Sequence, residues 1–238
     1  MINIKSDSRK VKEGDIFVAL RGISSDGHNY IDKAIHNGAS KVIAEEGTYD
    51  VDYEVVSDTR AYLNKYLKDN YKKYLDEMTI IGITGTNGKT TSAYLIYQAL
   101  NKLGMKCAYM GTIGYYLDKK VCNLSNTSPD ICEIYDMIIN AYDSGYKYIV
   151  MEVSSQGLGY DRFHGIDFNY ALFTNLTEDH LDYHKTMENY ALAKQQLFKQ
   201  CKGLNVINID DDYQDYFKIN NYVTYGFNKS DYQVTNYQ

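Results

Sequence analysis

The chain has 238 residues, a formal net charge of −6 and 44% hydrophobic residues. This length and apolar content suffice for one large or two small domains with a buried core. The acidic balance argues against a nucleic-acid partner and against a membrane surface, and no apolar run approaches a spanning helix. The four cysteines show no paired spacing and the N-terminus is no signal peptide, so we expect reduced thiols in a cytoplasmic protein.

Residues 1–77 predict a small α/β domain. Short apolar runs favour strands at residues 15–20, 41–44 and 53–56. Helices are expected over residues 30–37, closed by Gly38, and from about residue 59 to residue 73, where Ser57-Asp58-Thr59 would cap the start. A lysine- and tyrosine-rich stretch then leads to the boundary with a second domain, residues 78–238.

In this second domain, expected strands and helices alternate along the chain. Strands are predicted near residues 80–83, 106–110, 148–153, 170–176 and 204–209, and helices after residue 89 and over residues 131–144 and 187–201. Such alternation predicts an α/β fold with a parallel sheet, and ligands bind at the carboxyl ends of its strands.

The sequence I-G-I-T-G-T-N-G-K-T-T at residues 81–91 has the pattern of a phosphate-binding loop between a strand and a helix. Backbone N–H groups at a helix N-terminus attract anions, and glycine lets the backbone approach them. Lys89 would contact the outer phosphates and Thr90 would offer its hydroxyl to Mg²⁺. The usual first glycine is replaced by Ile83, so the loop is a variant, and the alternative is a helix-capping turn with a chance Gly-Lys-Thr.

Candidate metal ligands follow two other predicted strands. Glu152 lies where an apolar strand ends, at the sheet edge that binds ligands, although a surface charge at a strand end is the alternative. His180 and His184 lie in an acidic segment after the next strand and could bind metal or phosphate, whereas a loop histidine satisfied by its neighbours is the commoner outcome. The Ser154-Ser155-Gln156-Gly157 sequence lacks G-x-S-x-G, which argues against a serine hydrolase.

Seven stretches together resemble the Mur ligase family, and within it the UDP-N-acetylmuramoyl-tripeptide synthetase (MurE) type. The phosphate loop of that family also lacks the first glycine. The matching stretches are D-S-R-K-V-K-E-G-D-I-F-V-A-L-R-G at residues 7–22, D-G-H-N-Y-I at 26–31, I-G-I-T-G-T-N-G-K-T-T at 81–91, N-T-S-P at 126–129, M-E-V-S-S-Q-G-L at 151–158, F-T-N-L-T-E-D-H-L-D-Y-H at 173–184 and Y-A-L-A-K at 190–194.

The resemblance implies a set of site residues. The ATP phosphates would lie against Gly85, Thr86, Asn87, Gly88, Lys89, Thr90 and Thr91. Mg²⁺ would take Thr90, Glu152 and His180 as ligands. Lys194 matches the lysine that is carbamylated in the family, and Lys89, Lys194 and His180 would be the catalytic residues. Ser8, Ser24 and Ser25 would face the uridine diphosphate, and Thr127, Ser128, Ser154 and Arg162 would hold the sugar–peptide part.

The reaction that the resemblance implies is ATP-dependent amide formation on UDP-N-acetylmuramoyl-L-Ala-D-Glu through an acyl phosphate, in peptidoglycan precursor synthesis. The partners would be this nucleotide sugar and an amino acid that the sequence does not identify, and we expect a monomer. Two positions depart from the family pattern, Gln156 where many members have His and Tyr160 where some have Gln. They put individual substrate contacts in doubt, not the reaction class.

Family members run to about twice this length, as the resemblance implies, with a C-terminal amino-acid-binding domain that we expect to be absent here. We also expect the central ATP-binding domain, residues 78–238, to be incomplete at its C-terminal end. The chain alone would then bind nucleotide sugar and ATP phosphates without completing the reaction. One alternative is a non-catalytic remnant or fragment that binds the same ligands. Others are a related ligase, such as folylpolyglutamate synthetase, whose lack of a UDP-binding domain disagrees with residues 7–31, and a generic P-loop kinase or GTPase.

Overall fold

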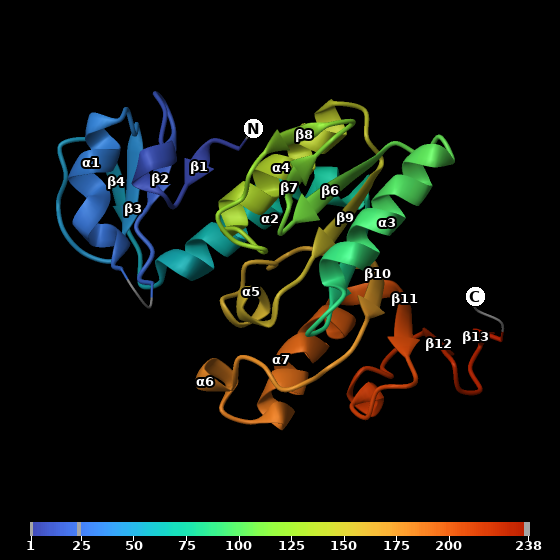
Figure 1. Ribbon diagram of the computed structural model, residues 1–238. Coiled ribbons are helices and arrows are strands. Elements are labelled where there is room, and N and C mark those ends of the chain that lie inside the picture. Colours follow the sequence, from blue (N-terminus) through green and yellow to red (C-terminus); the bar gives the residue numbers. More distant parts are fainter. Residues whose placement is uncertain (1, 23–24, 236–238) are drawn as a thin grey trace. The chain divides into compact units, whose positions relative to one another are not determined.

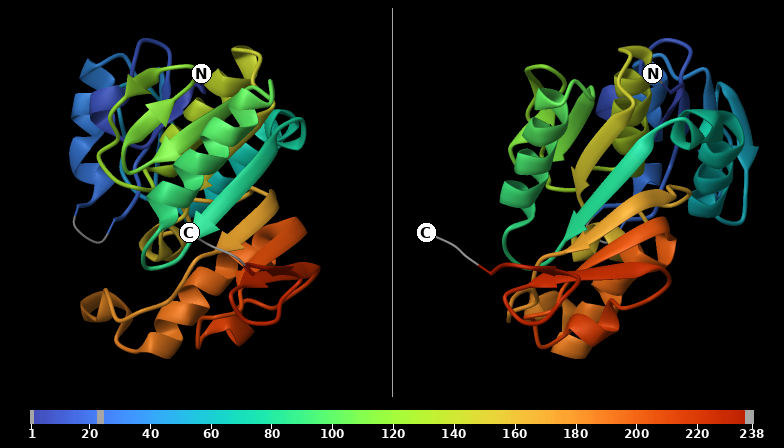
Figure 2. Two further views of the ribbon diagram at one scale, coloured as in Figure 1. Left: turned by 45° about the vertical axis from the view of Figure 1, so that its right-hand side comes forward. Right: turned by 90° about the vertical axis from the view of Figure 1, so that its right-hand side faces the viewer.

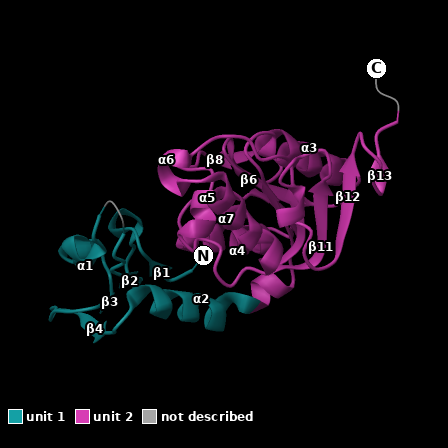
Figure 3. Ribbon diagram, turned by 90° about the horizontal axis from the view of Figure 1, so that it is seen from below, with its two compact units in different colours: residues 1–72 teal, residues 73–238 magenta. Residues whose placement is uncertain are grey.

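The computed structural model describes residues 2–22 and 25–235. The chain divides into two compact units, residues 1–72 and 73–238, coloured separately in Figure 3. Helix α2 (Thr59–Asp76) contains the division point, five residues before the boundary expected at residue 77. Within the described residues, no helix combines the length and apolar character needed to cross a bilayer.

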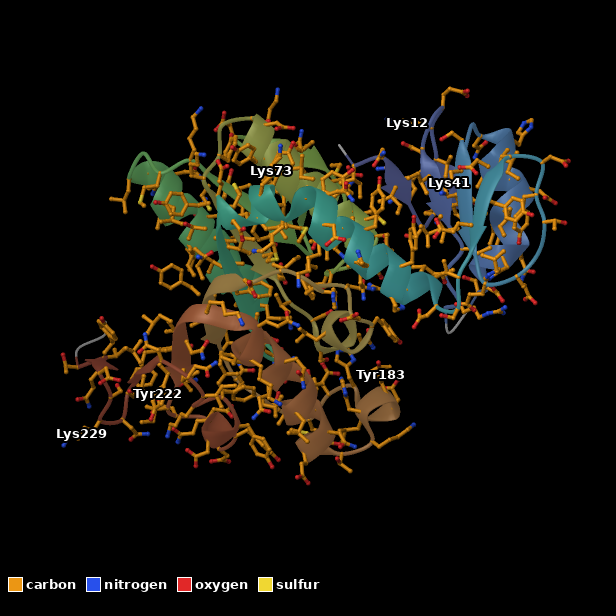
Figure 4. All side chains as sticks on the ribbon, turned by 180° about the vertical axis from the view of Figure 1, so that it is seen from behind. Lys12, Lys41, Lys73, Tyr183, Tyr222 and Lys229 are labelled. Carbon is orange, nitrogen blue, oxygen red and sulfur yellow. The ribbon has the colours of Figure 1, made fainter. Side chains whose placement is uncertain are left out.

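The first unit contains a four-stranded sheet in the order β1-β2-β3-β4, and all its printed strand pairs are parallel. Its strands and short helices are β1 (Ile4–Lys5), η1 (Ser8–Lys10), β2 (Ile16–Val18), η2 (Gly27–Tyr30), α1 (Ile31–His36), β3 (Lys41–Ala44) and β4 (Asp52–Val55). Phe17, Val42 and Ala34 are buried together in its core. Lys41 at the start of β3 is labelled in Figure 4.

The second unit is built on a nine-stranded sheet in the order β13-β12-β11-β10-β5-β9-β6-β7-β8. Figure 1 labels its elements. The strands are β5 (Thr79–Thr84), β6 (Cys107–Gly111), β7 (Gly114–Tyr116), β8 (Lys120–Cys122), β9 (Tyr148–Glu152), β10 (Phe168–Phe173), β11 (Cys201–Asn208), β12 (Tyr222–Gly226) and β13 (Tyr232–Gln233).

The helices of this unit connect consecutive strands. They are α3 (Lys89–Lys102), α4 (Ile131–Asp143), α5 (Ser155–Gly159), α6 (Leu181–His184), α7 (Met187–Gln200) and the short η3 (Gln214–Tyr216). Figure 2 shows α3 running alongside the strands of the sheet. Figure 4 labels Tyr183 on α6 and Tyr222 at the start of β12.

Strand β5 is the centre of this arrangement because its two faces pack against different helices. Ile81 and Ile83 belong to the cluster that includes Ala93 of α3. Side chains alternate along a strand, so Gly82 faces the other way, and a Cβ there would lie 2.7 Å from Leu197 of α7. One strand therefore positions the helix that follows it and the helix that carries Lys194.

The prediction of a parallel sheet is correct for the strands around β5 but not for one edge. Strands β6, β7 and β8 form antiparallel pairs. The sequence G-T-I-G at residues 111–114 makes the turn, and Gly114 has a φ of +124°. A side chain is disfavoured in that conformation, so the glycine allows the tight reversal that places Thr112 beside the end of β9.

Candidate active site

The phosphate-type loop joins the end of β5 to the start of α3, as the sequence predicts. Gly85 and Gly88 have φ values of +151° and +82°. A Cβ at Gly85 would lie 1.9 Å from Thr174 Oγ1, which leaves no room for any side chain. Thr174 Oγ1 donates a hydrogen bond of 2.7 Å to Asn87 O, so the end of β10 supports the loop at the position where only glycine fits.

The N-terminus of α3 has free hydrogen-bonding capacity. Gly88 occupies the N-cap and provides no side-chain bond, and Ser92 N donates to Gly88 O at 2.9 Å. By helix geometry the N–H groups of residues 88–91 have no intrahelical acceptor, and such groups attract anions. The Thr86 and Asn87 amides instead donate to Asn175, at 2.8 Å to its O and 2.9 Å to its Oδ1. The bonds of those two amides tie the loop to Asn175. The N–H groups of residues 88–91 point away from the helix at its N-terminal end, as helix geometry requires.

Two lysine side chains meet at one backbone oxygen of the loop. Lys89 Nζ donates to Gly85 O at 2.9 Å and to Thr86 O at 2.8 Å. Lys194 Nζ, from the middle of α7, donates to the same Gly85 O at 2.8 Å and lies 4.4 Å from the centre of the Tyr190 ring. Burial lowers the pKa of both ammonium groups, and the Lys89 charge lowers the pKa of Lys194 further.

Glu152 ends β9 and is completely buried, so the alternative of a surface charge is wrong. Its Oε1 accepts bonds from the Tyr109 hydroxyl at 2.5 Å and from Thr112 N at 2.9 Å. Its Oε2 accepts bonds from the hydroxyls of Thr90 at 2.8 Å and Thr112 at 3.0 Å. A Cβ at Gly111 would lie 2.2 Å from Oε1, so glycine admits the carboxylate. The loop threonine and the β9 carboxylate therefore lie together, as the sequence led us to expect.

These donors suit a hard divalent cation. No group of three or more His, Cys, Asp or Glu side chains that could hold a metal occurs in residues 2–22 and 25–235. Mg²⁺ does not need such a cage, because it is commonly held by one or two carboxylates together with substrate phosphates and water. Glu152 and Thr90 supply one carboxylate and one hydroxyl, both oxygen donors, beside the amides of the α3 N-terminus.

His180 and His184 have different surroundings. His180 is exposed, with a φ of +52°, and its Nε2 lies 3.5 Å from Asp179 Oδ2. His184 is buried, its ring stacks on Tyr190, and its Nε2 lies 2.9 Å from Ser155 Oγ. Burial lowers the pKa of His184 and the Ser155 hydroxyl is a hydrogen-bond partner for its ring, so the alternative of a histidine satisfied by its neighbours holds for His184. His180 is the more exposed of the two histidines, and its role as a metal ligand stays a prediction.

Four predicted substrate residues gather where β9 meets α5. Ser128 is buried, its hydroxyl donates to Glu152 O at 3.2 Å and accepts from Ser154 N at 3.0 Å. The Ser154 hydroxyl accepts from Gly157 N at 3.0 Å and caps α5. Arg162 donates to Ser128 O at 2.5 Å. The Thr127 and Thr112 hydroxyls lie 3.0 Å apart, which links this group to the carboxylate.

The predicted contacts for uridine diphosphate belong to the first unit. Ser8 is buried at the start of η1, and its backbone oxygen accepts a 2.8 Å bond from the Asn37 side chain. Ser25 is exposed, and its backbone oxygen accepts a hydrogen bond from Gly22 N at 3.0 Å. Ser24 lies outside the described residues.

Sequence reasoning missed Tyr109, Thr112 and Asn175. Tyr109 lies within a predicted strand with no motif to mark it, and Asn175 lies within the matching stretch at residues 173–184 but was given no role. Thr112 follows a predicted strand, and only the reversal at residues 111–114 brings its amide to Glu152. The signal available for Thr112 was its position as a polar residue between two glycines, directly after a predicted strand.

Two family models and several proteins of known name match this chain over most of its length. A model described as the Mur ligase middle domain matches residues 83–238, and one described as the Mur ligase family catalytic domain matches residues 2–83. A protein of Clostridium botulinum named UDP-N-acetylmuramoyl-L-alanyl-D-glutamate–2,6-diaminopimelate ligase is 43% identical over 95% of this chain and 49% of its own length. A protein of Fusobacterium nucleatum with the same name is 42% identical over 96% of this chain and 49% of its own.

Solved structures agree with the sequence matches. The structure of a UDP-N-acetylmuramoyl-L-alanyl-D-glutamate–2,6-diaminopimelate ligase superimposes with a TM-score of 0.77 at 32% identity, covering 95% of this chain and 48% of its own. A MurF ligase of Thermotoga maritima in complex with ADP has a TM-score of 0.66 at 26% identity, covering 96% of this chain and 51% of its own. The chain thus spans about half the length of the relatives that it matches.

Proposed function

Since the chain belongs to the Mur ligase family, we propose that it provides the ATP-phosphate site of an ATP-dependent ligase in peptidoglycan precursor synthesis. The proposed acceptor is UDP-N-acetylmuramoyl-L-Ala-D-Glu. The names of the relatives favour 2,6-diaminopimelate as the amino acid that is added. We also propose that the protein is cytoplasmic and monomeric.

The observation that carries the proposal is the meeting of three groups at the carboxyl ends of β5 and β9. The uncapped N-terminus of α3, the Lys89 ammonium and the Thr90–Glu152 pair all lie there. A bound triphosphate needs N–H donors for its anionic oxygens, a cationic side chain and oxygen ligands for a metal, and these three groups supply that combination. A helix-capping turn with a chance Gly-Lys-Thr would not need a buried carboxylate against its threonine.

The chemistry follows from the low electrophilicity of a carboxylate. An oxygen of the acceptor carboxylate attacks the γ-phosphorus of ATP, the bond to the β–γ bridging oxygen breaks, and ADP leaves. The amine of the amino acid then attacks the acyl carbon, inorganic phosphate leaves, and the amine gives up a proton. Lys89 and the amides of residues 88–91 would orient the phosphates, which is the main protein contribution to phosphoryl transfer. Mg²⁺ held by Thr90, Glu152 and the phosphates would neutralise charge between two anionic reactants.

Lys194 is proposed to act as a carbamate. The ammonium group first gives up one proton. The neutral amine then attacks CO₂, an N–C bond forms and a second proton is released, so the two steps together change the side chain from a cation to an anion. The lowered pKa of Lys194 favours the neutral amine that this step requires. The change would also remove the repulsion between two ammonium groups at the Gly85 oxygen. His180 is proposed to join the metal ligands when substrates are bound.

Amino-acid-dependent ADP release tests the proposal, with residues 1–238 and with the product of the full reading frame. We expect ADP release by a competent protein to require both UDP-N-acetylmuramoyl-L-Ala-D-Glu and 2,6-diaminopimelate, with lysine as the comparison amino acid. ADP release at the same rate with and without these two substrates would indicate a simple nucleotidase and contradict the proposal. Turnover with lysine but not diaminopimelate would overturn only the choice of amino acid.

A further inference from the structure

Tyr109 contacts the proposed cation site through Glu152 rather than directly. It lies in the middle of β6, is fully buried, and its hydroxyl donates to Glu152 Oε1 at 2.5 Å. A buried hydroxyl is costly unless it has a partner, and this carboxylate provides that partner. A phenylalanine would fill the same space without that requirement, so packing alone does not explain a tyrosine here.

The Tyr109 ring is held by three other tyrosines. Its centre lies 5.7 Å from the ring centre of Tyr94, 6.2 Å from that of Tyr97 and 5.7 Å from that of Tyr116, all in edge-to-face geometry. Tyr94 and Tyr97 belong to α3, the helix that begins at the phosphate loop, and Tyr116 belongs to β7. Edge-to-face contacts stabilise aromatic pairs. The ring, and with it the hydroxyl, is therefore fixed relative to α3.

The two oxygens of Glu152 have separate sets of donors. Oε1 accepts from the Tyr109 hydroxyl and from the Thr112 amide, which both belong to the β6–β7 hairpin. Oε2 accepts from the Thr90 hydroxyl and the Thr112 hydroxyl. Both donors to Oε2 are threonine hydroxyls, which can rotate their protons away when a cation arrives. On Oε1 the Thr112 amide N–H cannot rotate, and the Tyr109 hydroxyl is carried by a ring that three other tyrosines hold in place. Oε2 is therefore the oxygen that can exchange a hydrogen bond for a metal, and Oε1 is the oxygen that is anchored.

We propose that Tyr109 is a positioning residue, which anchors Glu152 Oε1 so that Oε2 faces a divalent cation together with Thr90. This inference rests on the proposed function, because it needs the cation–nucleotide site at the phosphate loop. Hydrogen bonds of this kind to a metal ligand typically change metal affinity by about 10- to 100-fold. The tyrosine cluster thereby acquires a role in the site in addition to packing.

The test uses Tyr109→Phe, which keeps the ring and removes the hydroxyl. Tyr116→Phe is the matched control, since it removes a hydroxyl from the same ring cluster without touching Glu152. Calorimetry measures the dissociation constant of ATP in EDTA and again with saturating Mg²⁺. The ratio of the two constants reports the coupling between cation and nucleotide. Circular dichroism and the thermal midpoint show whether each variant is folded.

Mg²⁺ is expected to tighten ATP binding, and we expect Tyr109→Phe to reduce this gain in ATP affinity by about tenfold. The affinity for ATP in EDTA should be unchanged. Glu152→Gln should lower the tightening at least as much, and Tyr116→Phe should leave it as in the original chain. Equal tightening in Tyr109→Phe and the original chain would overturn the inference, and so would equal losses with and without Mg²⁺, because those indicate structural damage. Failure of the original chain to bind ATP at all would contradict the proposed function, and with it the site that the inference requires.

Discussion

Lys89 and Lys194 donate hydrogen bonds to the same carbonyl oxygen, that of Gly85, at 2.9 Å and 2.8 Å. One lysine comes from the first turn of α3 and the other from the third turn of α7, on the opposite face of β5. Two ammonium groups on one oxygen repel each other, and Lys194 is only 1% exposed, so water cannot screen the repulsion. The arrangement disfavours two positive charges and favours a neutral Lys194.

The first prediction concerns the pH dependence of stability in Lys194→Met. Because the folded-state pKa of Lys194 lies well below its ordinary value of 10.5, the unfolded chain binds more protons between those two values. Stability must therefore rise with pH across that window, by up to about 1.4 kcal/mol per pH unit. Methionine removes the titration and should flatten this rise. Urea unfolding of both proteins in CO₂-free buffer, from about pH 7 to about pH 9, measures the difference.

Lys89 also has a lowered pKa and is present in both proteins, so the difference between the two pH profiles reports the titration of Lys194 together with its coupling to Lys89. An identical pH dependence for the original chain and Lys194→Met would mean that Lys194 is not shifted.

The second prediction separates a steric effect from a backbone effect at glycine. Gly85 and Gly145 both have positive φ, +151° and +81°, but a Cβ meets Thr174 Oγ1 at 1.9 Å in one case and nothing within 4 Å in the other. Gly145→Ala should cost about 1 kcal/mol from backbone strain alone. Gly85→Ala should cost about 3 kcal/mol or more, because the loop or β10 must also move. Equal unfolding free energies for the two variants would show that Thr174 does not confine the loop.

The third prediction tests the substrate side of the site. Arg162 donates to Ser128 O and its guanidinium carbon lies 5.3 Å from the centre of the Tyr160 ring. If this cation also holds the sugar–peptide part, Arg162→Ala should weaken binding of UDP-N-acetylmuramoyl-L-Ala-D-Glu by about 10- to 100-fold, the usual effect of a charge-assisted bond. ATP affinity should not change. Calorimetry with each ligand provides the measurement, and the exposed Lys202→Ala is a charge-matched control.

Unchanged affinity for the nucleotide sugar in Arg162→Ala would confine Arg162 to supporting the Ser128 segment. A parallel loss of ATP affinity would instead indicate that the β9–α5 junction had been disrupted.

The sequence predicts the parts of the site that depend on local pattern. A glycine loop between an apolar strand and an amphipathic helix predicts β5 and α3, and a carboxylate ending an apolar run places Glu152 at the correct sheet edge. What the pattern does not contain is long-range pairing. The antiparallel β7 and β8 arise from tertiary pairing, and the Tyr109 hydroxyl reaches Glu152 only because β6 lies beside β9.

The histidines illustrate the same limit. His180 and His184 are four positions apart in one acidic segment, and nothing local distinguishes them. The short helix α6 buries His184 against Ser155 and Tyr190 and leaves His180 exposed. The two histidines differ in exposure because of how α6 packs, and the local sequence does not predict that packing.

The central claim is that Lys89 and the α3 N-terminus bind the phosphates of ATP, and calorimetric titration of Lys89→Ala with Mg·ATP tests it most directly. The exposed Lys102→Ala, in the last turn of the same helix, is the matched control. We predict that Lys89→Ala weakens ATP binding by about 100-fold, as expected for a charge-assisted phosphate contact of about 3 kcal/mol, and that binding of UDP-N-acetylmuramoyl-L-Ala-D-Glu is retained. Undiminished ATP binding by Lys89→Ala would contradict the account.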